Sequence, residues 1–459
     1  MIDVTIVSLY LVLVFSIGIF VGRRTASFED FAVAGRQYGP LVIFTTLSAS
    51  FIGGGFSIGN AEKVFLFGIA NIFGLWGFSL KEFLVAKYLA PQIGNFEGAV
   101  SIGDIMAPNF GKIGRIISGI MALALCSGIV GAQVGAIGVI FNVFFGFSPT
   151  VGILLGCGIV ILYTSVGGMR AVVLTDIVQF VVLAIGIPLV LIYGIIYIGG
   201  VDALIASVPR ERFAIPGPSF TWLSLLSLFL AFFFGEALVP PYVQRLLIGK
   251  NAKAASQGTL LSSIFSIPFF VITGLIGLVA LAIDPDMPAR LAMPEVIITV
   301  MPPVLQGLVI AGIISVVMSS ADSFLNSAAV ALVNDIAQPI VGWQLTKRTK
   351  LNFARATTIS IGVASVIFAL SIESVLDILI FAYTYWAPVM LVPLWATIIG
   401  IQRNRATFLV SAIAGITSTI IWNLSVAQSL KIEGFVFGVL INLIVFWLAP
   451  KVSLAIGNK

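Results

Sequence analysis

The sequence has no histidine, only two cysteines and few charged residues. Asp, Glu, Lys and Arg make up 9% of the 459 residues, whereas a soluble domain carries about a quarter. Without histidine the chain lacks the commonest general base and the commonest transition-metal ligand. Cys126 and Cys157 lie in separate apolar runs, which suggest neither a disulfide framework nor a metal knuckle. These absences argue against a membrane enzyme, so we expect no enzymatic activity.

Apolar residues dominate instead, at 59% of the chain with a mean hydropathy of +1.14. Apolar stretches of about twenty residues recur from end to end, which is typical of an all-α polytopic protein embedded in a lipid bilayer. We predict about thirteen transmembrane helices. Their approximate limits are 2–22, 40–60, 66–93, 114–145, 148–165, 171–199, 220–246, 254–284, 303–338, 353–372, 374–400, 406–427 and 434–455.

The distribution of basic residues predicts the orientation. No Lys or Arg precedes the first span, and Arg23 and Arg24 follow it directly, which indicates an uncleaved helix with its N-terminus outside and a cytoplasmic C-terminus. Most basic residues, including Arg245, then fall in predicted cytoplasmic loops or the adjoining helix ends. The exceptions are Lys63, Lys81, Arg210, Arg212, Arg290 and Lys431. The basic pI therefore reports topology in a plasma (inner) membrane and does not indicate a nucleic-acid partner.

Two spans contain helix-breaking residues near their centres. The second, "LVIFTTLSASFIGGGFSIGN", has small residues and three glycines between Ser50 and Gly55. The seventh contains Glu236 followed by Pro240 and Pro241. Interrupted helices at matching positions of two halves point to the binding site of a transporter, here with halves formed by spans 2–6 and 7–11. The alternative is close helix packing at small residues.

The ninth span carries a polar run, "MSSADSFLNS", inside an otherwise apolar segment. Asp322 and Ser323 follow Ser319 by three and four residues, so they share one helical face with it, and Ser320 lies beside them. Sodium is a hard cation that prefers oxygen ligands, and such hydroxyls could meet the free carbonyls of an unwound helix around 49–53. The alternative is serines that bond their own helix and an aspartate paired with a basic neighbour.

These segments together resemble the sodium:solute symporter family. The resemblance rests on "FAVAGRQYGPLVIFTTLSASFIGGG", "TSVGGMRAVVLTDIVQF", "YVQRLL" and "MSSADSFLNSAAVALVNDI", and it covers essentially the whole chain. It implies a five-plus-five inverted-repeat core at 40–400, with its first repeat at about 40–199 and its second at about 220–400. An extra helix and loop at 1–39 precede the core, and two helices at 401–459 follow it.

The resemblance also implies ion-binding residues. A first Na+ site would use backbone carbonyls of the broken second span and the polar turn of the ninth. Its residues would be Ala49, Ile52, Val316, Ser319 and Ser320. Some members of the family bind a second sodium, which here would use Asp176, Asp322 and Ser323. The same carboxylates could instead hold a proton, so the number of coupled ions stays open.

The substrate site is predicted around the two breaks. Its candidate residues are Ser50, Phe51, Gly53, Gly54, Lys81 and Glu236. Lys81 would provide the counter-charge for a substrate carboxylate; the alternative is snorkelling toward the interface or pairing with another helix. Sugar-binding members of the family carry amide side chains where this chain has Glu236 and two prolines. A carboxylate or an amino acid is therefore favoured over a sugar.

The sequence thus predicts a sodium-coupled secondary active symporter that imports a small organic solute by alternating access and functions as a monomer. A proton-coupled symporter of the same fold is the main alternative. A channel is a weaker one, because the chain shows no filter-like repeat and no ring of charged residues. The sequence does not specify which solute is carried.

Overall fold

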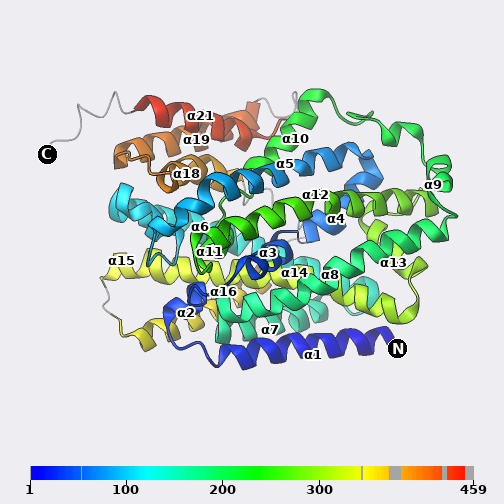
Figure 1. Ribbon diagram of the computed structural model, residues 1–459, viewed down its shortest axis with the longest axis horizontal. Helices are drawn as coiled ribbons and strands as arrows, with labels where there is room; N and C mark the ends of the chain where they lie inside the picture. The colour runs from blue at the N-terminus through cyan, green and yellow to red at the C-terminus, as the bar shows by residue number, and fades with distance from the viewer. Residues whose placement is uncertain (1, 53, 343–344, 372–383, 426–431, 450–459) are drawn as a thin grey trace.

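The computed structural model consists of helices that lie side by side, most of them along the long dimension of the molecule (Figure 1). It describes residues 2–52, 54–342, 345–371, 384–425 and 432–449. Within these ranges the only strand-like pairing is one isolated bridge between Tyr38 and Gly249. The all-α class predicted from the sequence is confirmed.

The chain begins with α1 (Ile2–Gly22), which lies along one edge of the molecule (Figure 1). The short helix α2 (Phe28–Val33) follows, capped by the Ser27 hydroxyl. The predicted second span is formed by two helices, α3 (Pro40–Phe51) and α4 (Gly54–Phe67), which are bent relative to each other by 47°. The break therefore falls at the run of glycines that predicted it, although Gly53 lies outside the described residues.

The rest of the first half consists of helical elements joined by short connections, and the longest of them, α6, contains a kink. Its elements are α5 (Ala70–Leu84), the π-turn η1 (Val85–Leu89), the 3₁₀ turn η2 (Ala90–Asn95), α6 (Ile102–Phe145), α7 (Pro149–Gly167) and α8 (Met169–Tyr197). α6 begins well before the predicted limit of 114, because Ser101 caps an additional segment. Gly111, with a φ of 66°, joins that segment to the main helix, and this left-handed conformation favours glycine.

The second half contains a second broken span. Its elements are α9 (Val201–Ser207), η3 (Arg210–Phe213), α10 (Trp222–Phe234), α11 (Pro240–Leu247), α12 (Ala252–Ile283), η4 (Ala289–Leu291), α13 (Ala292–Val300), α14 (Pro303–Val330), the π-turn η5 (Ala331–Ala337) and α15 (Gln338–Val341). Pro240 and Pro241 begin α11 rather than interrupting a helix interior. The chain reaches them through Leu238, which has a φ of 53°.

α16 (Lys347–Ser371) packs against α6, α7 and α14, on the same side of the molecule as α1 (Figure 1). The remaining C-terminal elements lie at the edge of the molecule opposite α1. They are the π-turn η6 (Ala387–Leu391), α18 (Val392–Ile398), α19 (Arg405–Ser425) and α21 (Gly434–Leu448). α19 and α21 pack against each other and against η6. Parts of the last four predicted spans, at 372–383, 426–431 and 450–459, lie outside the described residues.

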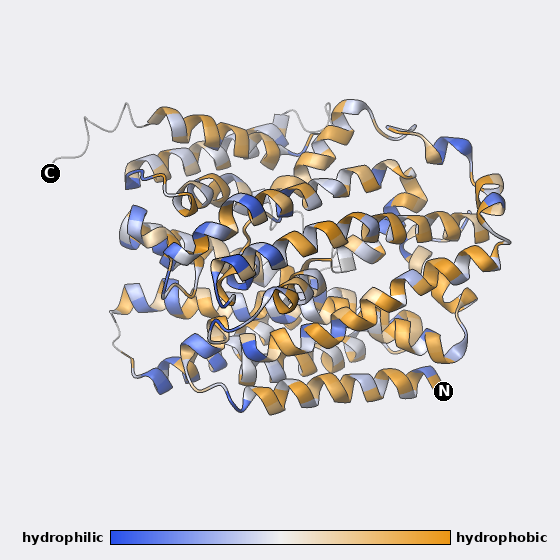
Figure 2. Ribbon diagram, in the orientation of Figure 1, coloured by the Kyte–Doolittle hydropathy of each residue, from blue (hydrophilic) through white to orange (hydrophobic). Residues whose placement is uncertain are grey.

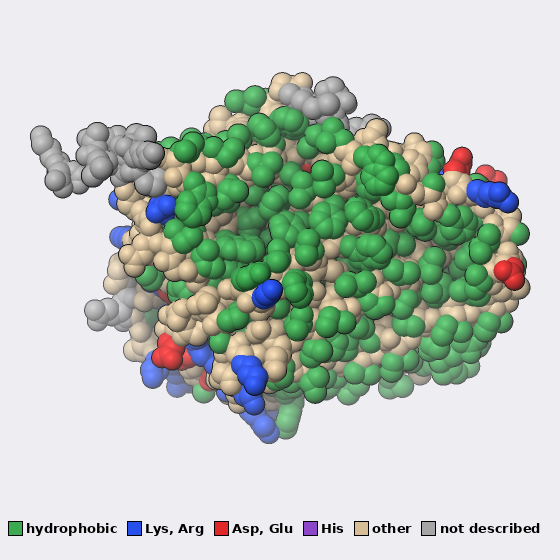
Figure 3. Space-filling view, turned by 45° about the horizontal axis from the view of Figure 1, so that its top comes forward, with side chains coloured by type: hydrophobic (Ala, Val, Ile, Leu, Met, Phe, Trp, Pro, Cys, Tyr) green, Lys and Arg blue, Asp and Glu red, His purple; other side chains and the backbone are tan. Residues whose placement is uncertain are grey.

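Length and composition mark seven of the described helices as able to cross a membrane, and the bent pair α3–α4 as an eighth. Apolar side chains cover most of the face seen in Figure 3, and Lys, Arg, Asp and Glu gather toward the two ends of the bundle (Figures 2 and 3). The protein is therefore a multi-pass membrane protein. The number of thirteen crossings stays a prediction.

The helix α14 forms the centre of the bundle. Every residue from Val309 to Val330 is buried, which is the mark of a helix surrounded on all sides. α14 packs against α1, α3, α6, α7 and α8. Its polar run therefore lies inside the protein and does not face lipid.

Candidate functional site

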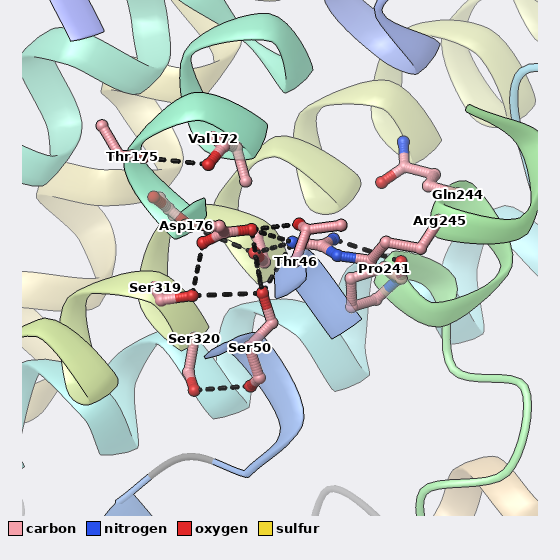
Figure 4. A network of polar contacts seen from close by, with 12 residues as sticks. Thr46, Ser50, Val172, Thr175, Asp176, Pro241, Gln244, Arg245, Ser319 and Ser320 are labelled. Carbon is pink, nitrogen blue, oxygen red and sulfur yellow. Dashed lines mark hydrogen bonds and ion pairs between the residues drawn. The ribbon is translucent and has the colours of Figure 1, made fainter. Parts of the chain in front are cut away.

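The end of α3 meets the polar turn of α14 inside the bundle (Figure 4). Because α3 ends at Phe51, its last carbonyl groups lack donors within the helix. The Ser320 hydroxyl lies 2.8 Å from the Ser50 carbonyl and 3.2 Å from the Val316 carbonyl, and it can donate to either. The polar run of the ninth predicted span thus faces the break in the second.

Asp176 lies on α8, and donors from three other helices surround its carboxylate (Figure 4). Ser319 of α14 donates to one oxygen at 2.5 Å. The other oxygen accepts from Thr46 and Ser50 of α3 and from the Arg245 guanidinium of α11 at 3.1 Å. The side chain is fully buried, and a charge at that depth needs such partners.

The Arg245 side chain connects the two broken spans. Its Nη2 donates to Ser50 at 2.7 Å, to Asp176, and to the Ser323 hydroxyl, while Nη1 donates to the Pro241 carbonyl at 3.2 Å. The sequence places Arg245 at a predicted cytoplasmic helix end but does not reveal that its side chain is completely buried. The sequence signal that could have identified Arg245 is its position about one turn after the break of the seventh span. In the structure, all residues of the helix that carries it are buried.

Asp322 lies on the same turn of α14 as Ser323. Its carboxylate accepts from the Tyr163 hydroxyl of α7 at 2.5 Å and from Ser323 at 3.1 Å. Because Ser323 also contacts Arg245, which pairs with Asp176, one hydrogen-bonded network joins the two carboxylates. The predicted ligands of a second sodium ion, Asp176, Asp322 and Ser323, therefore belong to one network. The Arg245 guanidinium contacts two of them, Asp176 and Ser323.

The first set of predicted ligands contains no acidic side chain. The protons of Ser319 and Ser320 are engaged with Asp176 and with a backbone carbonyl, so the hydroxyl lone pairs remain for a cation. Ala49 is in the last turn of α3, and Ile52 is its cap. In the described parts of the chain no group of three or more His, Cys, Asp or Glu residues could hold a metal ion.

The predicted substrate residues divide between this network and an aromatic region beside it. Ser50 belongs to the network, with its hydroxyl 3.2 Å from Ser319 and 3.0 Å from Ser323. Phe51 packs instead against Tyr242 of α11 and Phe324 of α14, with ring centroids 5.3 and 6.1 Å apart. Gly54 begins α4, and Gly53 lies outside the described residues.

Lys81 of α5 also contacts Tyr242. Its Nζ is 4.5 Å from the Tyr242 ring centroid and 3.7 Å from that of Phe78. The side chain is fully buried, so the snorkelling alternative is wrong. The half-buried Glu236, in the break between α10 and α11, lies within electrostatic range of Lys81.

Comparison with known proteins decides the class. The model of the sodium:solute symporter family matches residues 31–415. The chain belongs to the sodium:solute symporter family. It is therefore a sodium-coupled symporter, as the sequence motifs predicted. The family and its structural neighbours are transporters, which agrees with the expectation that the chain is not an enzyme.

Relatives of this symporter carry several kinds of solute. It is 25% identical to a high-affinity proline transporter of Bacillus subtilis, over 87% of this chain and 90% of the relative. It is 24% identical to the sodium/proline symporter of Escherichia coli, over 96% and 92%, and 26% identical to the sodium/pantothenate symporter of Haemophilus influenzae, over 68% and 65%.

The fold of the symporter is also that of a solved structure. A Na+-coupled sialic acid symporter in a substrate-bound, outward-open state superposes with a TM-score of 0.88, covering 98% of both chains at 19% identity. At that identity the likeness shows the fold alone.

Proposed function

We propose that the symporter couples solute uptake to one sodium ion bound where the end of α3 meets α14. The ligands would be the carbonyls of Ala49, Ile52 and Val316 and the hydroxyls of Ser319 and Ser320. The observation that carries this proposal is the orientation of the two hydroxyls, which both contact Ser50 near the end of α3. Their protons are engaged with Asp176 and with the Ser50 carbonyl, so their lone pairs remain for a cation. Oxygen ligands of this kind suit a hard, weakly charged cation.

Such a site also explains how the ion promotes closure. α3 belongs to the first proposed repeat and α14 to the second, so a cation shared between them stabilises the conformation in which they touch. A positive charge that crosses the membrane down a potential of 100 mV releases about 2.3 kcal/mol. Alternating access would use this energy to accumulate the solute.

The second predicted ion site has a competing occupant. Asp176 and Ser323 are both contacted by the Arg245 guanidinium, so a second sodium would have to displace a tethered cation. We propose that Arg245 supplies this positive charge and that one sodium is coupled per cycle. A second sodium would require Arg245 to withdraw. Proton coupling would require Asp176 or Asp322 to bind and release a proton during the cycle.

Sodium binding can be tested without knowing the solute. The thermal unfolding midpoint of the purified protein should rise with NaCl but not with N-methyl-D-glucamine chloride at equal ionic strength. Ligand at about 100 times its dissociation constant adds about 2.7 kcal/mol to the free energy of unfolding. A thermal unfolding midpoint that does not change with sodium but shifts with pH would favour the proton-coupled alternative.

The finer features complete the proposal. We propose an inverted-repeat core at 40–400 with thirteen crossings, an outside N-terminus, a cytoplasmic C-terminus and function as a monomer. In support, the start of α1 and the end of α21 lie at opposite ends of the bundle (Figure 1). For the solute we propose a small carboxylate or amino acid, because relatives carry proline and pantothenate and Lys81 lies next to the break.

A further inference from the structure

Two oppositely charged residues lie next to each other in α5, buried and unpaired. Lys81 and Glu82 are both 0% exposed. Neither the Lys81 ammonium nor either Glu82 oxygen has a hydrogen-bond partner among the described residues. The Ser262 hydroxyl of α12 faces Glu82 without completing a hydrogen bond. Because successive side chains on a helix diverge by about 100°, the two charges also fail to form an ion pair with each other.

Burying these two unpaired charges lowers the free energy of unfolding, so folding alone does not explain them. A buried charge without a partner costs several kcal/mol, and here two such groups occupy consecutive positions. Replacement by apolar residues of similar size would remove the cost. Unsatisfied charges buried inside a membrane protein point to a functional site, here a ligand that satisfies them.

Both charges adjoin the two breaks. Lys81 lies over the face of Tyr242, in the first turn of α11, and Glu82 is close enough to interact electrostatically with Tyr242. Tyr242 in turn packs against Phe51, at the end of α3. The Tyr242 hydroxyl is buried and faces the Thr259 hydroxyl of α12, but it likewise completes no hydrogen bond among the described residues. A ligand between the breaks would thus meet an ammonium, a carboxylate and a hydroxyl against aromatic walls.

We propose that Lys81 and Glu82 form a two-point site for a zwitterion, with the substrate carboxylate on Lys81 and its ammonium on Glu82. This inference rests on the proposed symport function and defines its solute class as an amino acid. A ligand with both charges satisfies both buried groups. A ligand with one charge leaves the other buried and unpaired, which costs about 2–5 kcal/mol, or roughly 30-fold to several-thousand-fold in affinity.

The first test compares ligand charge. The thermal unfolding midpoint of the purified full chain is measured with the twenty common amino acids, β-alanine and 4-aminobutyrate, in NaCl and in N-methyl-D-glucamine chloride. For each amino acid that binds, the deaminated acid and the decarboxylated amine are tested beside it. We expect at least one zwitterion to stabilise the protein in sodium, and both analogues to bind at least about 30-fold more weakly.

Variants then assign each charge. Lys81→Met should abolish the preference for the zwitterion over the amine, and Glu82→Gln its preference over the acid. Lys81→Arg should retain carboxylate binding. The controls are Lys87→Met and Glu97→Gln, at exposed positions nearby, which should bind as the wild type does. The sodium-dependent midpoint verifies that each variant is folded.

The outcomes separate this inference from the function on which it rests. If sodium stabilises the protein but no amino acid does, the zwitterion site is refuted and sodium coupling stands. Equal affinity for a zwitterion and its deaminated acid refutes the role of Glu82. If every Lys81 or Glu82 variant is unfolded, the wild type alone can still refute the proposal. It does so if its affinity for the deaminated acid or the decarboxylated amine equals its affinity for the zwitterion. If sodium has no effect on the wild type, the proposed function itself is wrong.

Discussion

Replacing Ser319 and Ser320 with alanine should weaken sodium binding by about 100-fold or more. The double variant removes two of the five proposed oxygen ligands. A hydrogen bond to a charged group contributes about 1.5–3 kcal/mol; if a hydroxyl–sodium contact is of similar strength, two of them contribute about 3–6 kcal/mol. Each 1.4 kcal/mol is tenfold in affinity. We expect the lower end of that range, because water can replace a lost hydroxyl.

The two single variants should differ in their side effects. Ser319→Ala also removes a donor to Asp176 at 2.5 Å, whereas Ser320→Ala removes the link to the Ser50 carbonyl at 2.8 Å. The matched control is Ser315→Ala, one turn earlier on α14, whose hydroxyl contacts Tyr10 and the Ala311 carbonyl. Its sodium affinity should match the wild type.

The assay is a sodium titration of the thermal unfolding midpoint, followed by sodium-driven uptake in proteoliposomes once a solute is known. The half-saturating sodium concentration should rise in the double variant and stay unchanged in Ser315→Ala. A folded double variant with wild-type sodium dependence would refute the assignment of this site.

Three further predictions concern the buried charges. Arg245→Met and Asp176→Asn should each destabilise the protein by about 3–5 kcal/mol, and the double variant by less than the sum of the two, in a double-mutant cycle of unfolding. If Arg245 is the internal cation, sodium-dependent uptake should have a Hill coefficient near one for sodium, and Asp322→Asn should leave that coefficient unchanged. A wild-type coefficient well above one would instead support binding of a second sodium ion. Asp335→Asn should lower stability without altering sodium affinity, because that carboxylate bonds Ser101 at 2.6 Å and lies away from the proposed site.

The broken spans and the polar run were predictable from sequence because each has a local cause. Glycine and proline act on the backbone of their own helix, and the spacing of Ser319 and Ser323 fixes their common face. The sequence did not reveal features that depend on contacts between helices far apart in the chain. Arg245 looks like an interfacial residue by composition, yet α3, α8 and α14 surround it. Likewise, no periodic pattern reveals that Tyr163 of α7 bonds Asp322.

The charge balance of the network gives a reason for sodium to bind next to it. As carboxylates, Asp176 and Asp322 carry two negative charges, and Arg245 offsets one of them. Asp322 accepts hydrogen bonds from Tyr163 and Ser323, which suits an ionised group but does not neutralise it. A sodium ion on Ser319 would lie one hydrogen bond away from Asp176 and would bring the sum to zero. Because uncompensated charge is costly at low dielectric, we expect the network without sodium to favour states that admit a cation, and the neutral network to favour closure.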